Sequence, residues 1–195
     1  MWGRGQALAG PLMGTVGKLF DEDQIARRVD GLAHAIVEAV GPDFVVVGVL
    51  KGSFVLMADL VRALSRAGAA PRIEFMRLAS YGQKQESSGE VLLLGDAPRD
   101  FEGKPVLLVD DIVDTGFSLD YGRKLLAGRN VARVWTCALL DKPSRRKVEL
   151  SVDFIGFEIP DVFVVGYGID FAEQYRYLPY IGKVEKGAVD RMDRS

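Results

Sequence analysis

The stretch VLLVDDIVDTGFSL at residues 106–119 decides the fold, because an apolar run ends in two carboxylates and then turns toward a helix. The run lacks polar alternation, which predicts a strand over residues 105–110 that is covered on both faces of a parallel sheet. A helix is predicted from about residue 117 to Gly128. Ligands in open α/β sheets bind at the carboxyl ends of strands, so this junction is the predicted site of chemistry.

The segments around this junction alternate between predicted strands and helices. A helix is predicted from its capping residue Asp21 to Gly41-Pro42, and residues 44–50 (FVVVGVL) form a second buried strand followed by a helix to about Ala67. The chain after residue 167 is predicted to be irregular. The order indicates an α/β fold with a central, mostly parallel twisted sheet flanked by helices. Further strands are predicted at residues 72–79, 91–94, 131–140, 152–157 and 162–167.

The composition predicts one globular domain over residues 1–195, with residues 1–17 as a loose N-terminal arm. Of the 195 residues, 48% are hydrophobic and 27% are charged, unlike disordered chains. The net charge of -2 argues against a nucleic-acid-binding protein. No apolar run approaches the roughly 18 residues of a membrane-spanning helix. A single cysteine, Cys137, excludes an internal disulfide and favours a cytoplasmic protein, and the only histidine, His34, is predicted to face solvent without a role.

The junction combines the residue types that bind a phosphate with those that bind a cation or a diol. Gly116 permits close approach of the backbone, Thr115 and Ser118 offer hydroxyls, and the following helix presents free N–H groups. Adjacent carboxylates at Asp110 and Asp111 repel each other unless Mg²⁺ or a sugar diol lies between them. The alternative is an ordinary turn, because Asp, Thr and Gly all favour turns.

The junction resembles the signature with which type I phosphoribosyltransferases bind 5-phosphoribosyl-1-pyrophosphate (PRPP). Four other segments are similar to hypoxanthine-guanine phosphoribosyltransferases, and the similarity extends over residues 20–187 in the family's order. This resemblance implies the type I fold, in which a small hood from the chain ends lies beside the central sheet. The four segments are Leu50-Lys51-Gly52, RLASY at residues 77–81, LDKP at residues 140–143, and DFIGFEIPDVFVVGYGIDFAEQYR at residues 153–176.

The resemblance implies how PRPP would be bound. The backbone at Lys51-Gly52 contacts pyrophosphate, and the preceding Leu50–Lys51 peptide bond is cis; the alternative for Lys51 is a solvated turn lysine. Asp110 and Asp111 hold the ribose hydroxyls and a Mg²⁺ ion. The 5'-phosphate is wrapped by Asp114, Thr115, Gly116, Phe117 and Ser118. The family more often has Glu in place of Asp110 and Lys in place of Phe117, departures that affect affinity more than activity.

The resemblance also implies a purine site. Phe163 stacks on the base, the Val164 backbone reads its edge, and the Lys142 ammonium donates to the 6-oxo oxygen, although residues 163–165 alone read as a buried strand. Asp114 is the candidate for handling the proton on purine N7. Asp170, beside the purine, binds a second Mg²⁺, and Arg176 reaches the leaving group, its alternative being a structural salt bridge.

The implied reaction transfers the phosphoribosyl group of PRPP to N9 of a 6-oxopurine, giving IMP or GMP and pyrophosphate. Residues 80–90 form the predicted lid, with Ser80 and Tyr81 as contacts, and an ordinary hairpin is the alternative. Relatives form homodimers or homotetramers, so a homo-oligomer is expected. A PRPP- or nucleotide-sensing regulator on the same fold is the main rival, although no basic surface supports it. A phospho-receiver ranks last, because it leaves residues 157–170 unexplained.

Overall fold

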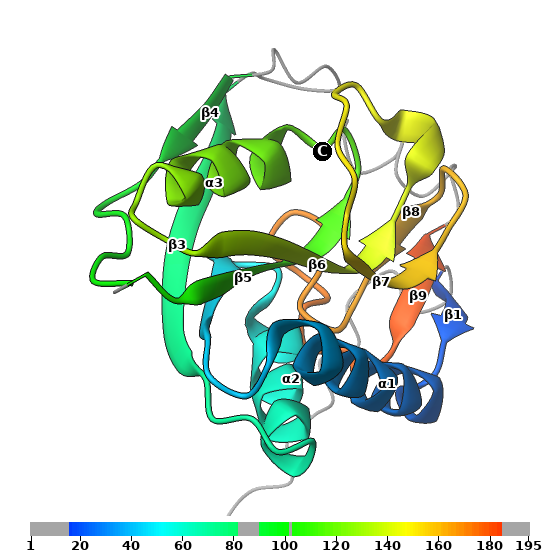
Figure 1. The fold of residues 1–195 in the computed structure, drawn as a ribbon. Coiled ribbons are helices and arrows are strands. Elements are labelled where there is room, and N and C mark those ends of the chain that lie inside the picture. Colours follow the sequence, from blue (N-terminus) through cyan, green and yellow to red (C-terminus); the bar gives the residue numbers. More distant parts are fainter. Residues whose placement is uncertain (1–15, 82–89, 102, 185–195) are drawn as a thin grey trace, which may run out of the picture.

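The computed structural model describes residues 16–81, 90–101 and 103–184, which form two β-sheets, three α-helices and one short 3-10 helix (Figure 1). The helices are α1 (Glu22–Val40), α2 (Phe54–Arg66) and α3 (Phe117–Ala127), and the 3-10 helix is η1 (Pro143–Arg145). The strands are β1 (Val16–Phe20), β2 (Val45–Leu50), β3 (Arg72–Tyr81), β4 (Glu90–Leu93), β5 (Pro105–Val113), β6 (Arg133–Asp141), β7 (Phe154–Glu158), β8 (Phe163–Val165) and β9 (Ile181–Val184).

The larger sheet has six strands in the order β4-β3-β2-β5-β6-β7. All neighbours are parallel except β3 and β4, which confirms the predicted mostly parallel sheet. Alternate residues of the central strand β2 face opposite layers: Val46 packs with α1 and α2, whereas Val45 and Val47 pack with α3. Both layers exclude water from this strand, which explains why its sequence is apolar throughout.

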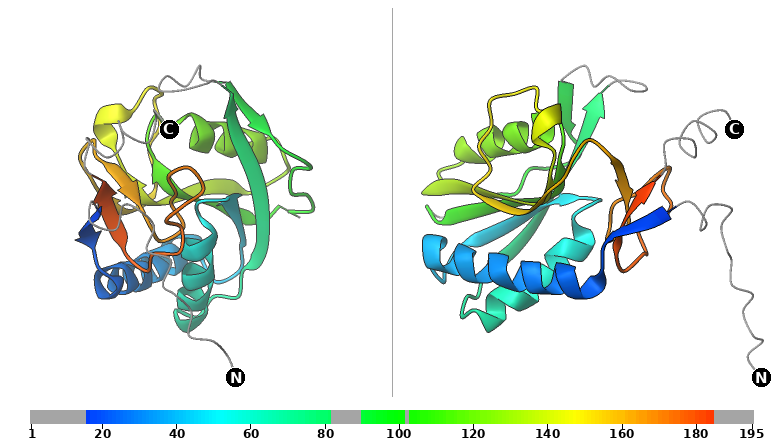
Figure 2. Two further views of the ribbon diagram at one scale, coloured as in Figure 1. Left: turned by 180° about the vertical axis from the view of Figure 1, so that it is seen from behind. Right: turned by 90° about the vertical axis from the view of Figure 1, so that its right-hand side faces the viewer.

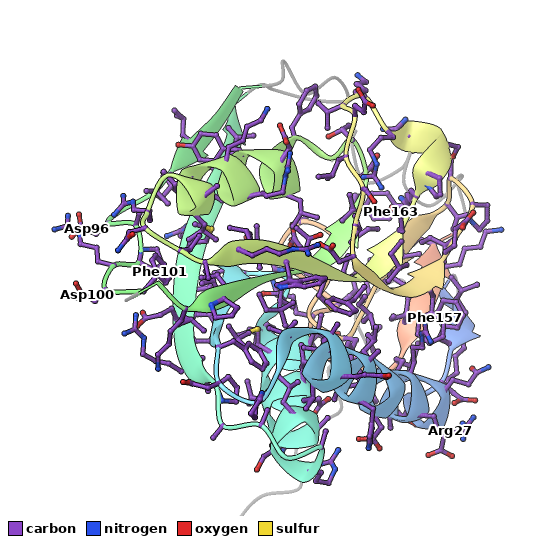
Figure 3. The ribbon with its side chains drawn as sticks, viewed as in Figure 1. Arg27, Asp96, Asp100, Phe101, Phe157 and Phe163 are labelled. Atoms are coloured by element: carbon purple, nitrogen blue, oxygen red, sulfur yellow. The ribbon has the colours of Figure 1, made fainter. Side chains whose placement is uncertain are left out.

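Helices cover both faces of the six-stranded sheet, with α1 and α2 on one face and α3 on the other (Figure 1). α1 begins as predicted, because the Asp21 side chain accepts from the Gln24 backbone while the Gln24 side chain accepts from the Asp21 backbone. In the α3 layer, Phe101 points inward and is 2% exposed, whereas Asp96 and Asp100 lie at the surface (Figure 3).

The second sheet is the predicted hood, a three-stranded antiparallel sheet in the order β1-β9-β8 that lies to one side of the main sheet (Figure 2). Phe20 of β1 stacks on Phe157 of β7 with ring centroids 4.0 Å apart, and this contact joins the sheets. Two expectations are wrong here. Residues 16 and 17 belong to β1 rather than to a loose arm, and β9 lies in the stretch predicted to be irregular. Both strands form through pairing between chain ends, which local sequence does not reveal.

Most strand boundaries differ from the predicted ones by one or two residues, and the differences in β5, β8 and β3 affect the site. β5 continues three residues past Asp110 because Ile112 and Val113 pair with β6, so the two carboxylates stand within a strand. β8 is shorter than predicted and ends at Val165. β3 extends to Tyr81, which pairs with Glu90 of β4, so the ends of the predicted lid are strand residues. Its remainder, residues 82–89, lies outside the described residues, as do residues 1–15 of the predicted arm.

Two side chains lie as the sequence predicts. Cys137 is fully buried in the layer beneath α1 and α2, and this burial raises the pKa of its thiol to about 12. His34 lies on the exposed face of α1, where its ring contacts the Asp30 carbonyl oxygen at 2.8 Å. In the described part of the chain, none of the helices combines the length and apolarity that crossing a membrane requires.

Candidate functional site

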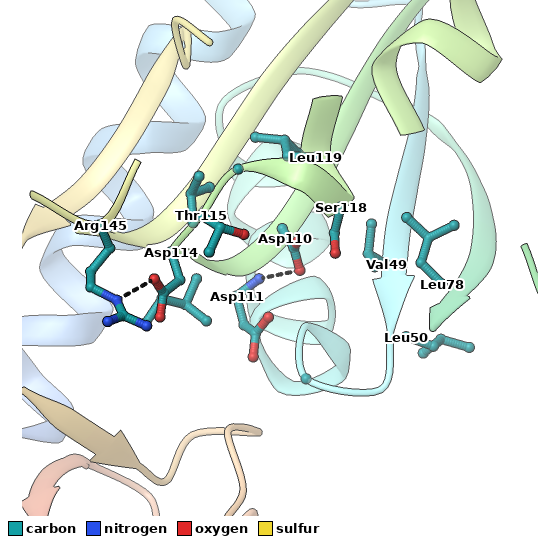
Figure 4. Close-up of a pocket in the computed structure, with 14 residues that line it drawn as sticks. Val49, Leu50, Leu78, Asp110, Asp111, Asp114, Thr115, Ser118, Leu119 and Arg145 are labelled. Atoms are coloured by element: carbon teal, nitrogen blue, oxygen red, sulfur yellow. Dashed lines mark hydrogen bonds and ion pairs between the residues drawn. The ribbon is translucent and has the colours of Figure 1, made fainter. Parts of the chain in front are cut away.

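A cleft of about 380 Å³ opens at the carboxyl ends of β2 and β5, where the sequence predicts the site (Figure 4). Its walls come from the ends of these strands, from β3, from the loop before α3 and from η1. One end of the cleft is formed by the loop before α3, and the other end carries the neighbouring carboxylates Asp110 and Asp111. Seven predicted site residues line it, namely Gly52, Asp110, Asp111, Asp114, Thr115, Gly116 and Ser118.

The loop before α3 has the features of an anion site. Gly116 adopts a left-handed φ of +88° at the N-terminus of α3, and no side chain caps the helix there. The first-turn N–H groups of an uncapped helix attract anions through hydrogen bonds and the helix dipole. A β-carbon at position 116 would lie 2.8 Å from Val148 Cγ2, so glycine is required on steric as well as conformational grounds.

The chain after β6 braces this loop from outside. The Lys147 N–H donates to the Thr115 carbonyl at 3.0 Å, and Arg146 Nη1 donates to the Asp114 carbonyl at 3.2 Å. Arg146 also forms an ion pair with the buried carboxylate of Asp141. The loop is therefore held in one shape before any ligand binds, as electrostatic preorganisation requires.

The acidic end consists of Asp110 and Asp111. Asp110 is 6% exposed, and its Oδ1 accepts from the Asp111 backbone N–H at 3.0 Å. Burial, together with the charge of Asp111, raises the pKa of Asp110 well above its usual value, and burial also raises the pKa of Asp111. Asp111 packs so tightly against Gly52 that a β-carbon at position 52 would lie 1.9 Å from its Oδ2.

These carboxylates fit a divalent cation. Among the described residues, Lys, Arg and His nitrogens all lie farther than 4.0 Å from both side chains, so the adjacent charges lack a direct counter-ion. The described part of the chain holds no cluster of three or more acidic, His or Cys side chains able to enclose a metal alone. Mg²⁺ is commonly bound by one or two carboxylates, with substrate oxygens and waters completing the coordination.

Asp114 lies between two cations at the side of the cleft. Arg145 Nε donates to its Oδ1 at 3.0 Å, and Lys142 Nζ lies 3.9 Å from its Oδ2 (Figure 4 shows the Arg145 contact). The Lys142 side chain is 8% exposed, and burial lowers the pKa of its ammonium. Lys142 does not line the cleft but approaches it through Asp114.

An aromatic surface lies in the hood. Phe163, at the start of β8, is 39% exposed and meets Phe171 edge to face with ring centroids 5.1 Å apart (Figure 3 labels Phe163). Val164 is buried beside it. Because β8 is an edge strand, the backbone N–H and C=O groups on one of its sides do not pair with another strand of the sheet. Phe163 and Val164 do not line the cleft, and neither does Phe117, the half-buried first residue of α3.

The turns after β8 carry a second charged cluster. Arg176 forms an ion pair with Asp170 at 2.7 Å and donates to the Gly168 carbonyl at 2.8 Å, whereas its buried Nε finds no hydrogen-bond partner among the described residues. Lys51 Nζ forms an ion pair with Glu173 at 2.7 Å. The Leu50–Lys51 peptide bond is cis, as the resemblance implied. Asp170, Arg176 and Lys51 lie outside the cleft lining.

Two sets of contacts in and around the site were not predicted from the sequence. Arg145 and Arg146 contact the loop before α3, and the only signal was the basic run that follows Lys142-Pro143. The Tyr167 hydroxyl donates to Asp59 Oδ2 of α2 at 2.5 Å. No local pattern links these two residues, because the contact joins segments that are distant in the chain.

Comparisons with known proteins agree with this geometry. A model of the phosphoribosyl transferase domain matches residues 15–172. The hypoxanthine phosphoribosyltransferase of Escherichia coli K12 is 46% identical over 173 residues, which cover 87% of this chain and 96% of that protein. The hypoxanthine-guanine phosphoribosyltransferase of Aquifex aeolicus is also 46% identical, with coverage of 86% and 93%.

Solved structures give the same result. The crystal structure of a Staphylococcus aureus hypoxanthine phosphoribosyltransferase superposes with a TM-score of 0.84 at 36% identity, covering 93% of this chain and 98% of that one. A hypoxanthine phosphoribosyltransferase of Trypanosoma cruzi gives a TM-score of 0.87 at 34% identity and covers 99% and 100%. The chain therefore belongs to the phosphoribosyltransferase family and, within it, to the hypoxanthine and hypoxanthine-guanine phosphoribosyltransferases.

Proposed function

We propose that this protein transfers the 5-phosphoribosyl group of PRPP to N9 of hypoxanthine or guanine, releasing pyrophosphate. The observation that carries the proposal is one cleft that combines an uncapped helix N-terminus behind Gly116 with the carboxylate pair Asp110 and Asp111. In the reaction the bond from C1' to the pyrophosphate oxygen breaks, its electrons leave with pyrophosphate, and a bond forms between C1' and N9. The base loses its ring proton, for which Asp114 is the proposed acceptor.

The end of the cleft formed by the loop before α3 would hold the 5'-phosphate. The loop from Asp114 to Ser118 offers hydroxyls from Thr115 and Ser118 and the N–H groups of the first turn of α3, which begins at Phe117. Because Arg146 and the backbone after β6 already brace this loop, little ordering is required when the phosphate binds.

The acidic end would hold the ribose hydroxyls and a metal. Asp110 and Asp111 are the proposed contacts to the diol and to one Mg²⁺, and Asp170, whose oxygens already accept from Arg176 and the Glu173 N–H, would use its remaining lone pairs for a second Mg²⁺. When bound, Mg²⁺ neutralises charge on the pyrophosphate.

On the leaving-group side, the backbone at Lys51-Gly52 would contact pyrophosphate. Arg176 would supply to the same group its Nε, which has no hydrogen-bond partner within the part of the chain that the structure describes. Residues 80–90, with Ser80 and Tyr81 as contacts, are the proposed lid that excludes water from the reacting C1'.

The base would lie between the cleft and the hood. The exposed ring of Phe163 offers a stacking face, the Val164 backbone an edge, and Lys142 a donor to the 6-oxo oxygen. Adenine carries an amino group at this position, so donor would face donor and binding would weaken. Asp114 would accept a hydrogen bond from the N7–H group of the purine and would act as the acceptor of that proton.

The proposal extends to the assembly. We propose one catalytic domain per chain and a homodimer or homotetramer in the cytoplasm. Exposed apolar side chains on the neighbouring strands β3 and β4, and directly after β4, support self-association. These are Ile73, Phe75, Leu92 and Leu94.

A pyrophosphate-release assay tests the proposal. The protein is incubated with PRPP and Mg²⁺ and with hypoxanthine, guanine, xanthine, adenine or uracil in turn. Turnover with hypoxanthine or guanine and not with adenine or uracil is expected. Silence with all five bases, combined with tight PRPP binding, would favour the sensing regulator instead, and turnover with adenine alone would overturn the role of Lys142.

A further inference from the structure

The carboxylate of Asp114 is shared unequally between its two cationic neighbours. Its Oδ1 accepts a hydrogen bond from Arg145 Nε at 3.0 Å, whereas Lys142 Nζ stays 3.9 Å from Oδ2, beyond hydrogen-bond distance. Arg145 therefore makes the direct bond, and Lys142 contributes only a longer-range attraction.

Lys142 keeps its donors free. Its side chain is 8% exposed, yet within residues 16–81, 90–101 and 103–184 its ammonium donates no hydrogen bond of ordinary length. An ammonium has three N–H donors, and although most of the Lys142 side chain is buried, its nitrogen is not among the fully buried atoms that lack a partner in the described residues. The donors are therefore open to solvent and to a ligand. A bound acceptor next to Asp114 would satisfy them.

Arg145 is held where it can compete for Asp114. It ends the short helix η1, and its backbone N–H donates to the Lys142 carbonyl at 3.0 Å, so both side chains leave one rigid turn. On its far side Arg145 Nη1 lies 3.8 Å from Asp161 of the loop before β8. The Asp114 hydrogen bond raises the pKa of the guanidinium, so Arg145 keeps its charge throughout the working range.

We propose that Arg145 is a positioning residue for base recognition. By bonding Asp114, it prevents this carboxylate from closing onto Lys142, and so keeps the Lys142 ammonium available for the oxo oxygen of the base. Removing Arg145 leaves Asp114 with Lys142 as its nearest cation, and a direct bond between the two then competes with the substrate. The inference rests on the proposed function, because it assigns the free ammonium to a 6-oxopurine.

Steady-state kinetics of Arg145→Gln test the proposal, with KM measured separately for hypoxanthine and for PRPP. The KM for the base is expected to rise about tenfold, the typical effect of losing one polar contact, while the KM for PRPP stays within about twofold. Arg145→Lys, which keeps the charge without the guanidinium fork, should recover part of the loss. Arg99→Gln, at an exposed arginine paired weakly with Asp96, is the matched control and should change neither constant.

A double-mutant cycle separates positioning from general damage. In an Asp114→Asn background no carboxylate is present to capture Lys142, so Arg145→Gln should then change the dissociation constant for GMP by less than about twofold. That constant is measured by calorimetry and needs no turnover. If Arg145→Gln does not fold, Arg145→Lys is used in its place, and it should still raise the KM for the base without raising the KM for PRPP.

Several outcomes would overturn the inference. An unchanged base KM in Arg145→Gln would do so, and so would a selective rise in the PRPP KM, which would make Arg145 a phosphate ligand. An equal effect on GMP binding in the presence and absence of the Asp114 carboxylate would also count against it. Failure of the proposed function is distinguishable, because the unmutated protein would then release no pyrophosphate with any base.

Discussion

The α-carbon of Gly168 lies directly against the carbonyl oxygen of Gly52, so closely that a β-carbon at position 168 would stand 2.2 Å from that oxygen. Gly168 also has a φ of +98°, a conformation that side chains disfavour. Through this contact, the turn that carries Asp170 and Arg176 packs against the loop that follows β2. Two segments that are distant in the chain can thus pack this closely only because residue 168 is glycine.

Gly168→Ala should therefore separate these loops. The methyl group meets backbone rather than a flexible side chain, so we expect destabilisation of roughly 1–3 kcal/mol and a fall in kcat/KM. Thermal unfolding and steady-state kinetics check both effects. Gly31→Ala is the control, because a β-carbon there meets nothing within 4 Å and its position in α1 favours alanine. Equal behaviour of the two variants would contradict the prediction.

Tyr167→Phe should loosen the same turn from its other side. The Tyr167 hydroxyl donates to Asp59 of α2 at 2.5 Å, and burial, followed by this hydrogen bond, raises the pKa of the phenol well above its usual value. Loss of the bond leaves Asp59 with Arg62 as its partner and should cost about 1–3 kcal/mol in the free energy of unfolding. Denaturant titration measures it, with the exposed Tyr177→Phe as the control. A loss no greater than that of the control would show that the hydrogen bond contributes nothing.

Asp110→Asn is expected to stabilise the metal-free protein at neutral pH. Burial raises the pKa of Asp110 well above its usual 3.8, so the folded state binds this proton more tightly than the unfolded chain does. Stability therefore falls as pH rises from about 3.8 through the folded-state pKa, and the neutral amide removes this loss. The Asn oxygen can still accept from the Asp111 N–H.

The check is denaturant unfolding of both proteins over a pH series without Mg²⁺. The gain should vanish below pH 3.8, where the carboxyl is protonated in both states. Asp96→Asn, at a fully exposed side chain, should show no comparable gain. A stabilisation that is the same at every pH would indicate a packing effect instead of relief of a buried charge.

Lys142→Met should remove recognition of the oxo group while keeping the aliphatic volume. We expect KM for hypoxanthine to rise by about 10–100-fold, because a buried donor to the substrate is lost. Burial lowers the pKa of the ammonium below 10.5, so activity of the unmutated protein should decline with rising pH before that value as the charged donor is lost. The pH profile of kcat/KM for the base tests this, and an identical alkaline limb in the Met variant would refute it.

Much of the fold follows from local pattern. Asp21 and Gln24 form the capping box that their spacing predicts, and the apolar strands β2 and β5 occupy the centre of the sheet, where only such sequences are stable. The loop before α3, with Gly116 at its end, could be predicted because all of its residues are neighbours in the sequence. The sequence did not predict the strands β1 and β9 at the chain ends, whose pairing spans nearly the whole chain, or the last three residues of β5.

The sequence by itself determined the layered sheet, the loop that ends β5 and its two neighbouring carboxylates, because these depend on periodicity and on residues a few positions apart. Only the tertiary structure decided that Arg145 bonds Asp114, that Tyr167 reaches Asp59 and that Gly168 rests on Gly52. Such contacts depend on where separate segments pack in space. Short-range propensities carry no information about that placement, since it is fixed by burial of the shared core.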